Sequence, residues 1–230
     1  MKAMKIALAA AAATVALSGA AMAEELKLSY NVGVFSDYVF RGVSQTQEDP
    51  AVQGGVDATY GIGYAGVWAS NVDFGANEPS AEIDFYAGLR PTVGDTSLDF
   101  GVLYYSYTKD KDLTPGAYSY FEFKAAASRT FGPATLGAAV YYSPEYPGKG
   151  GGATYFEANA AVPVAEKLTL SGAVGQQTIK NYKDYSTWNV GLAYALTDNL
   201  SADLRYHDTS EHDLGKIYDS RVVVSLKAAF

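Results

Sequence analysis

The last ten residues, Arg221-Val-Val-Val-Ser-Leu-Lys-Ala-Ala-Phe230, decide the fold class because apolar and polar side chains alternate through them. One face of an extended chain here collects Val222, Val224, Leu226 and Ala228. The other face carries Arg221, Ser225 and Lys227. This period of two predicts a β-strand with one apolar and one polar face.

The same alternation recurs upstream and predicts twelve strands of 8 to 10 residues. The segments are residues 26–34, 52–60, 64–72, 81–90, 98–107, 121–128, 134–143, 155–162, 168–175, 187–196, 200–207 and 221–230. Such lengths suit tilted transmembrane strands, which need about 9 to 11 residues. No transmembrane helix is predicted after residue 23, because Asp, Glu, Lys or Gly interrupts every long apolar stretch.

Charged side chains keep to one face of these segments. The apolar face of all twelve carries none, whereas the other face of eleven carries thirteen: Lys27, Asp57, Glu82, Asp84, Arg90, Asp99, Glu122, Lys124, Glu157, Asp203, Arg205, Arg221 and Lys227. The segment 64–72 has no charge on either face, so its facing stays open. A soluble sandwich or lipocalin-like barrel also alternates, so period two alone does not decide what the apolar face meets.

Loop lengths and aromatic positions favour a membrane barrel. Long connections at 73–80, 108–119, 144–154, 178–186 and 208–220 alternate with short turns at 61–63, 130–133, 163–167 and 197–199, as in outer-membrane barrels. Aromatic side chains also cluster at the strand ends and suggest interfacial belts: Tyr60, Tyr64 and Phe230 near short turns, and Tyr104, Phe121, Tyr142, Trp188 and Tyr206 near long loops. We predict an all-β, transmembrane, antiparallel up-and-down barrel of about 12 strands, closed by pairing of the first and last.

The N-terminus predicts a secretory signal peptide in residues 1–23, which leaves residues 24–230 for the barrel. Lys2 and Lys5 precede an apolar run over 6–17, and Ala21-Met22-Ala23 forms a small-residue cleavage site. Together with the barrel pattern, the signal peptide places the chain in the outer membrane of a Gram-negative bacterium. Its expected surroundings there are outer-membrane lipid and lipopolysaccharide.

Two resemblances go further than the pattern. The terminal strand ending in Phe230 is similar to the signal by which the outer-membrane assembly machinery recognises its clients. The stretches Asn31-Val-Gly-Val-Phe-Ser-Asp-Tyr-Val-Phe-Arg-Gly-Val-Ser-Gln-Thr46, Tyr64-Ala-Gly-Val-Trp-Ala-Ser-Asn-Val-Asp-Phe74 and Glu82-Ile-Asp-Phe-Tyr-Ala-Gly88 resemble the TorF family, proteobacterial proteins of unknown function classed with porins. This resemblance implies an outer-membrane barrel that forms a channel, and it implies no particular substrate.

Composition narrows the function. The absence of Cys excludes thiol catalysis and disulfides, and two His leave little for metal chemistry, so we expect no metal and no cofactor. A net charge of −8 argues against a nucleic-acid partner. Twelve strands enclose a backbone cylinder only about 24 Å across, which side chains narrow further. The sequence thus favours passive diffusion of small polar or charged solutes past a charged lumen; the alternative is a plugged lumen in which the same charges pair.

Residues 35–43 are unusually apolar for an exposed loop. The unbroken alternation favours continuation of the first strand to Arg41, while the alternative is a segment folded into the barrel mouth as a constriction. Both interpretations place Asp37 and Arg41 near the outer opening.

Two other functional classes stay open besides the channel. A rim enzyme, a protease or lipid hydrolase, is conceivable because His212 lies beside Asp213, with Asp208 near. No Ser stands in a recognisable nucleophile context, so we expect no enzyme. A non-conducting structural or adhesin barrel is the third class.

Overall fold

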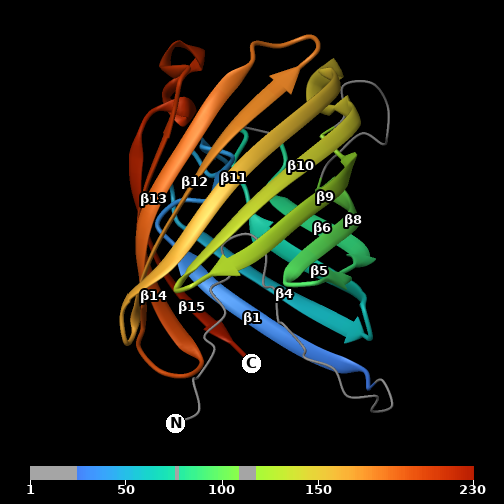
Figure 1. Cartoon of the computed structure of the whole chain (residues 1–230). Coiled ribbons are helices and arrows are strands. Elements are labelled where there is room, and N and C mark those ends of the chain that lie inside the picture. Colours follow the sequence, from blue (N-terminus) through green and yellow to red (C-terminus); the bar gives the residue numbers. More distant parts are fainter. Residues whose placement is uncertain (1–24, 76–77, 109–117) are drawn as a thin grey trace.

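Twelve antiparallel strands close into a barrel in this computed structural model, which describes residues 25–75, 78–108 and 118–230 (Figure 1). They are β1 (Lys27–Phe35), β4 (Ala51–Tyr60), β5 (Gly63–Asn71), β6 (Ala81–Leu89), β8 (Thr96–Tyr107), β9 (Tyr120–Phe131), β10 (Ala134–Tyr146), β11 (Gly151–Ala165), β12 (Leu168–Ile179), β13 (Tyr185–Ala195), β14 (Leu200–Thr209) and β15 (Arg221–Ala229). Each coincides with one predicted segment. The expected signal peptide, residues 1–23, lies outside the described residues.

Short elements complete the chain. β2 (Val39–Phe40) pairs with β3 (Val43–Ser44) in a small hairpin of its own, and β7 (Thr92–Val93) extends the turn before β8. In the described loops lie three single-turn 3₁₀ helices: η1 (Pro147–Lys149), η2 (His212–Leu214) and η3 (Lys216–Tyr218). In the described part of the chain, no helix has the length and apolar character needed to span a bilayer.

The first and last strands close the barrel, as predicted. β1 pairs with β15 from Asn31 opposite Ala229 to Phe35 opposite Ser225. Tyr30 and Phe230 exchange backbone hydrogen bonds of 3.0 and 2.9 Å at the end of this seam. Phe230 therefore completes the closure, and its role as an assembly signal stays a prediction.

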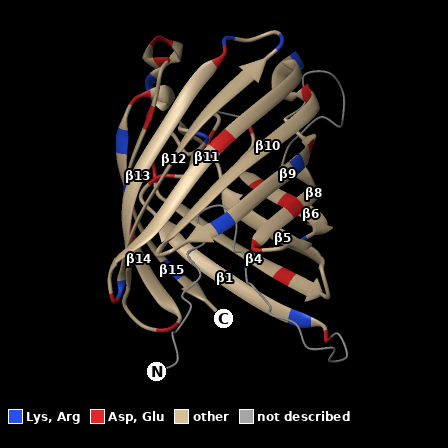
Figure 2. Ribbon diagram, viewed as in Figure 1, with Lys and Arg blue, Asp and Glu red and all other residues tan. Residues whose placement is uncertain are grey.

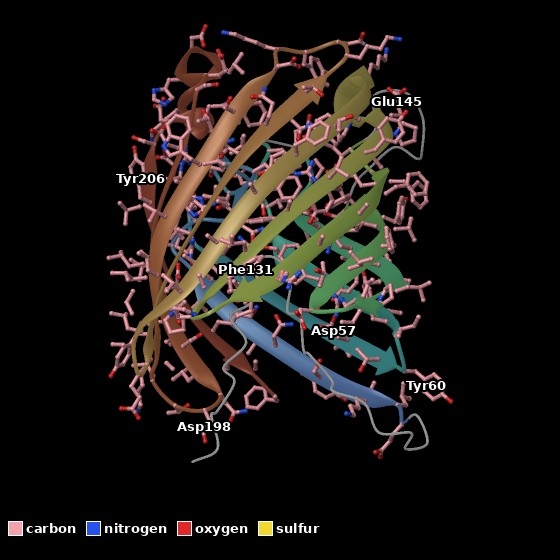
Figure 3. The ribbon with its side chains drawn as sticks, viewed as in Figure 1. Asp57, Tyr60, Phe131, Glu145, Asp198 and Tyr206 are labelled. Carbon is pink, nitrogen blue, oxygen red and sulfur yellow. The ribbon has the colours of Figure 1, made fainter. Side chains whose placement is uncertain are left out.

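The two faces of the wall have opposite polarity. On β15, Val222 and Val224 point outward and are 59% and 55% exposed, whereas on β6 and β9 Glu82 and Glu122 point inward and are 1% exposed. Figure 2 marks the charges along the strands and in the loops, and Figure 3 shows Tyr60 pointing away from the barrel at its short-turn end. This is the polarity of a transmembrane barrel, in which apolar side chains meet lipid and polar ones fill the interior.

Several strands run beyond their predicted ends, among them three neighbouring strands at the outer loops. β10, β11 and β12 have 13, 15 and 12 residues, so most of the expected long loop 144–154 is strand, and the expected loop 178–186 shortens to residues 180–184. Pairing continues to Tyr146 opposite Gly151 and to Ala153 opposite Ile179. Outside the bilayer a strand needs no apolar outer face, so the alternation stops before the hydrogen-bond ladder does.

The β1–β4 connection folds into the barrel instead of extending β1. β1 ends at Phe35, so the favoured hypothesis of a strand reaching Arg41 is wrong and the alternative, an inward fold, is correct. Tyr38 and Val43 are buried inside, where they pack in place of facing lipid. An apolar side chain satisfies the alternation equally well in either place, which is why periodicity misled the prediction. We call residues 37–46 the inner hairpin.

Candidate functional site

The tip of the inner hairpin is a two-residue turn at Arg41 and Gly42, whose φ angles are 49° and 83°. Two consecutive positive φ values are typical of the type I′ turn that favours tight hairpins, with Gly at the second position. The tip also touches the wall. A Cβ on Gly42 would lie 2.3 Å from Thr187 Oγ1 on β13 and 2.7 Å from Thr209 Cγ2 on β14. Only glycine therefore fits the tip at its present depth.

Arg41 is fastened to the far wall. Its two terminal nitrogens donate to the two carboxylate oxygens of Glu122 on β9, at 2.8 and 2.7 Å. One of them also donates to Gln177 Oε1 on β12 at 3.1 Å. The Tyr105 hydroxyl on β8 donates to Glu122 at 3.0 Å and holds the carboxylate in place. The side chains of Arg41 and Glu122 are 5% and 2% exposed, so this pair is buried in the lumen.

Aromatic rings enclose the same guanidinium. Its central carbon lies 4.3 Å from the ring centre of Tyr155, 4.9 Å from that of Tyr141 and 4.6 Å from that of Phe40. These distances are typical of cation–π contacts. Sequence reasoning missed Gln177, Tyr141 and Tyr155; each occupies an inward position of its strand, and only charged residues were counted there.

The base of the inner hairpin is fastened separately. Asp37 accepts hydrogen bonds from Ser44 at 2.7 Å and Thr46 at 2.9 Å, both within the hairpin. Arg221 at the outer end of β15 pairs with Asp37 at 3.0 Å. The guanidinium of Arg221 also donates to the backbone carbonyl of Asp219, in the loop before β15. Asp37 and Arg41, both predicted at the mouth, thus attach the hairpin at its base and at its tip.

A second cluster surrounds Asp99, closer to the short-turn end of the barrel. Lys124 and Arg90 pair with it at 2.8 and 3.2 Å, and the Tyr64 hydroxyl donates to it at 2.7 Å. Tyr64 is thus buried in the interior, and its predicted place in a lipid-facing belt is wrong. Tyr64 can turn inward because Gly88 has no side chain: a Cβ on Gly88 would lie 2.5 Å from the Tyr64 hydroxyl.

Other predicted lumen residues form local pairs. Asp203 pairs with Arg205 at 3.0 Å, and Arg205 also donates to Asn189 at 2.8 Å. Asp57 accepts from Tyr86 at 2.6 Å, and Glu157 accepts from Tyr155 at 3.1 Å. Lys27 is exposed at the start of β1, and Lys227 is partly buried on β15. The thirteen predicted residues are therefore spread along the wall in several clusters.

Glu82 and Asp84 on β6 differ from the other buried lumen acids. Glu82 accepts a hydrogen bond from the Tyr107 hydroxyl at 2.8 Å. Within the described residues, neither carboxylate makes an ion pair with Lys or Arg, and Glu82 Oε2 and Asp84 Oδ1 have no hydrogen-bond partner. Across the described ranges, no group of three or more His, Cys, Asp or Glu side chains is placed to hold a metal ion.

Comparison with known proteins places the chain in a family. Residues 19–230 match the family described as "Bacterial protein of unknown function (Gcw_chp)". The chain belongs to this family. No curated protein matches the Gcw_chp chain in a comparison of sequences. This match supports one part of the predicted resemblance, namely a bacterial family of unknown function with a porin-like barrel. The TorF name itself stays a prediction.

Solved porin structures share the fold of the Gcw_chp chain. The KdgM porin has a TM-score of 0.60 at 9% identity, over 88% of this chain and 98% of that chain. The NanC porin has a TM-score of 0.55 at 10% identity, with the same coverage of 88% and 98%. Omp33 of Acinetobacter baumannii has a TM-score of 0.53 at 9% identity, over 90% and 98%. At such identities the likeness shows the barrel fold.

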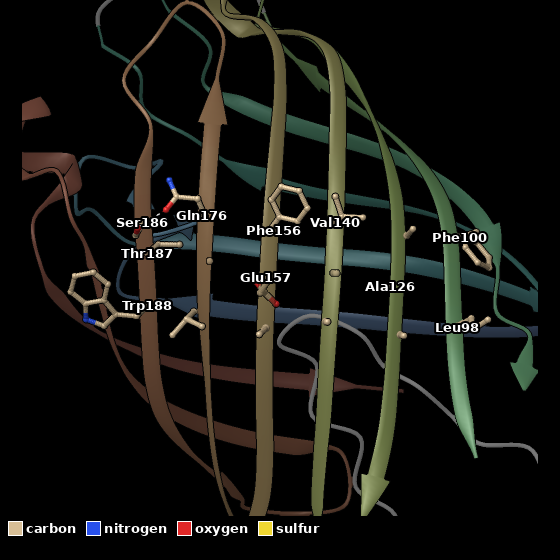
Figure 4. A pocket seen from close by; sticks show the side chains of 17 residues that line it. Leu98, Phe100, Ala126, Val140, Phe156, Glu157, Gln176, Ser186, Thr187 and Trp188 are labelled. Atoms are coloured by element: carbon tan, nitrogen blue, oxygen red, sulfur yellow. Dashed lines mark hydrogen bonds between the residues drawn. The ribbon is translucent and has the colours of Figure 1, made fainter. Parts of the chain in front are cut away.

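A hollow of about 950 Å³ on the Gcw_chp chain is not part of the lumen (Figure 4). Outward side chains from two neighbouring rows border it, among them Phe156, Val174 and Trp188. The residues between these two rows point their side chains into the barrel, which leaves a shallow trough on the outer face of the wall. Lipid chains would fill it, and we do not assign it to solute passage.

The outer rim of the Gcw_chp barrel holds the predicted acid/base histidine. His212 Nε2 lies 2.8 Å from Asp208 Oδ1, and Asp208 also accepts a hydrogen bond from the Tyr206 hydroxyl at 2.8 Å. The hydrogen bond to Asp208 raises the pKa of His212. Asp213, the neighbour considered from sequence, instead contacts Lys183 at 3.2 Å. The imidazole is therefore tied to a carboxylate and, through it, to a phenol.

Proposed function

We propose that this barrel is an outer-membrane porin for small polar or charged solutes, with a lumen controlled by the inner hairpin. One observation carries the proposal: the hairpin crosses the lumen and is fastened by two ion pairs, Arg41 with Glu122 and Asp37 with Arg221. Because both attachments are contacts between side chains, movement of the hairpin would break no hydrogen bond between the strands of the wall. In this proposal the lumen is the pathway of the solute, and the inner hairpin is the element that obstructs it.

The polarity of the wall supports the membrane setting. Apolar side chains on the outer face suit lipid, and inward charges suit an aqueous or polar interior. The fold shared with the KdgM and NanC porins supports passive diffusion as the mode of transport. In this proposal residues 1–23 direct export, and outer-membrane lipid, lipopolysaccharide and the assembly machinery are the partners of the barrel. The thirteen inward charged residues line the route of the solute.

The chemistry of the attachments supports movement of the hairpin. Charged groups withdrawn from water gain little net free energy by pairing, because desolvation offsets much of their attraction. Water entering the lumen could solvate both partners of each pair. Displacement of the hairpin thus costs little at the two ion pairs, and its main cost is the exposure of buried apolar side chains such as Tyr38 and Val43.

The two other classes have weaker support. The His212–Asp208–Tyr206 chain lacks a hydroxyl nucleophile bonded to the imidazole among the described contacts, so we do not propose a rim enzyme. A purely structural barrel would need no removable segment across its lumen.

Single-channel recording in planar bilayers tests the proposal. We expect small or infrequent steps from the wild type, and larger or more frequent steps from Asp37→Ala and Arg41→Ala. Arg129→Ala is a matched control, because Arg129 pairs with Asp95 at 3.0 Å on the exposed outer side of the wall. If the wild type and both hairpin variants are silent at every voltage, the porin proposal fails.

A further inference from the structure

The groups that hold Arg41 belong almost entirely to the barrel wall. Glu122 lies on β9, Tyr141 on β10, Tyr155 on β11 and Gln177 on β12. We call these four residues the Arg41 site. Only Arg41 itself and Phe40 come from the inner hairpin. Withdrawal of the hairpin would therefore vacate the site without dismantling it.

The Arg41 site has the features of a guanidinium receptor. The Glu122 carboxylate accepts two parallel hydrogen bonds, at 2.8 and 2.7 Å, from the planar guanidinium. This two-pronged geometry matches a guanidinium and not the point charge of an ammonium group. Gln177 Oε1 accepts a further hydrogen bond, and the rings of Tyr141 and Tyr155 contact the cation. Glu122 and Gln177 thus match the hydrogen-bond donors of a guanidinium group, and the two tyrosine rings match its positive charge.

The charge balance of the neighbourhood also favours a cation. Without Arg41, Glu122 would be a buried carboxylate with no ion-pair partner. Asp84 lies opposite Tyr105, which bonds Glu122, and neither Asp84 nor Glu82 has a Lys or Arg partner among the described residues, so no cation of this neighbourhood replaces Arg41. An emptied site would therefore present the Glu122 carboxylate without a counterion, and its negative charge attracts cations and repels anions.

We propose that the Arg41 site binds guanidinium-bearing solutes, and that Arg41 occupies it as a tethered surrogate for such a solute. Because Arg41 is part of the chain, its effective concentration at the site is high, and a free solute must compete with it. Binding to the vacated site does not depend on conduction. The further step, displacement of the hairpin by a solute during passage, rests on the proposed porin function.

Binding to the Arg41→Ala variant tests the site directly. The probes are methylguanidinium and L-arginine at millimolar concentration, measured by isothermal titration and by the rise in melting temperature of the detergent-solubilised barrel. We expect saturable binding to Arg41→Ala and at least about tenfold weaker binding to the wild type. Methylammonium, which lacks the planar fork, and urea, which lacks the charge, are the control ligands.

A second variant ties the binding to Glu122. We expect Arg41→Ala combined with Glu122→Gln to bind methylguanidinium about tenfold or more weakly than Arg41→Ala alone, because the charged acceptor is lost. Arg129→Ala, which changes an arginine outside the lumen, should bind like the wild type. Circular dichroism and heat-dependent electrophoretic mobility establish that each variant is folded, and Arg41→Gln replaces Arg41→Ala should the latter not fold.

The outcomes separate this proposal from the porin proposal. A folded Arg41→Ala barrel that binds methylguanidinium no better than the wild type, or no better than methylammonium, would overturn the guanidinium site. Equal binding by the double variant would overturn it as well. Saturable binding in a barrel that never conducts would instead leave the site standing and reject the porin. In a conducting Arg41→Ala barrel, we expect methylguanidinium to reduce the open-channel current.

Discussion

Arg41 and Glu122 join two nearly opposite sides of the barrel through a two-pronged ion pair. The inner hairpin leaves the wall after β1, and β9 lies five strands from β1 in one direction and seven in the other. This pair is therefore a strut across the lumen, whose strength depends on both partners being present.

Removal of one partner should destabilise the barrel. We expect Glu122→Ala to lower the free energy of unfolding by about 3–5 kcal/mol, because Arg41 is left as a buried charge without its counterion. Urea unfolding in lipid vesicles measures this. Arg129→Ala, at an exposed pair, should cost no more than about 1 kcal/mol. Equal small losses at both sites would contradict a buried strut, and the double variant Arg41→Ala with Glu122→Ala should cost less than the sum of the single changes.

Gly42→Ala should displace the inner hairpin. The added Cβ would lie 2.3 Å from Thr187 Oγ1, at a residue whose φ is 83°. We expect lower stability and larger conductance steps. Gly94→Ala is the matched control, because Gly94 has a φ of 60° with nothing within 4 Å of the added Cβ. Gly94→Ala therefore measures only the cost of placing Ala in this backbone conformation, about 1 kcal/mol. A conductance that Gly42→Ala leaves unchanged would argue against a hairpin that packs against β13.

Ala138 and Ala139 test which face of the wall meets lipid. Ala138 points outward, whereas Ala139 points inward opposite Glu157 on β11. We expect Ala138→Lys to lower the free energy of unfolding in vesicles by about 2–4 kcal/mol, the cost of a basic side chain at the bilayer midplane. Ala139→Lys should cost clearly less, since Glu157 supplies a counterion. A reversed order would show that the assignment of the two faces is wrong.

His212 should make the stability of the outer rim depend on pH. Its pKa is raised in the folded protein by the hydrogen bond to Asp208. Protonated His212 therefore stabilises the fold fully below the unfolded pKa of about 6.5, and this stabilisation disappears as pH rises through the higher folded pKa. Melting temperatures from pH 5 to pH 9 should fall more for the wild type than for His212→Gln. Nuclear magnetic resonance titration of the imidazole should give a pKa above 6.5. A lower pKa would contradict the hydrogen bond between His212 and Asp208.

Much of the wall was predictable because each strand must satisfy two solvents. An outward charge in a lipid-facing strand costs about 2–4 kcal/mol at the bilayer midplane, so the alternation had to be strict and could be read from sequence. The segment 64–72 lacked charges, and this is where the facing of Tyr64 was assigned wrongly. Its place beside Asp99 depends on space left by Gly88, a neighbour on another strand.

The inner hairpin was not decided by local pattern. Tyr38 and Val43 satisfy an apolar environment equally well in lipid or inside the barrel, so their spacing fits both. Asp37 and Arg41 were recognised as mouth residues, but their partners Arg221 and Glu122 are 184 and 81 residues away along the chain. No local periodicity encodes such a pairing.

The sequence by itself determined the strands, their facing where charges occur, and the closure of the barrel, because these follow from the local requirement that each strand present one side to lipid and one to a polar interior. Only the tertiary structure decided what fills that interior. Closure brings Glu122, Gln177, Tyr141 and Tyr155 from four strands around one point, and the guanidinium of Arg41 occupies it because charge, hydrogen bonds and ring contacts are satisfied there together.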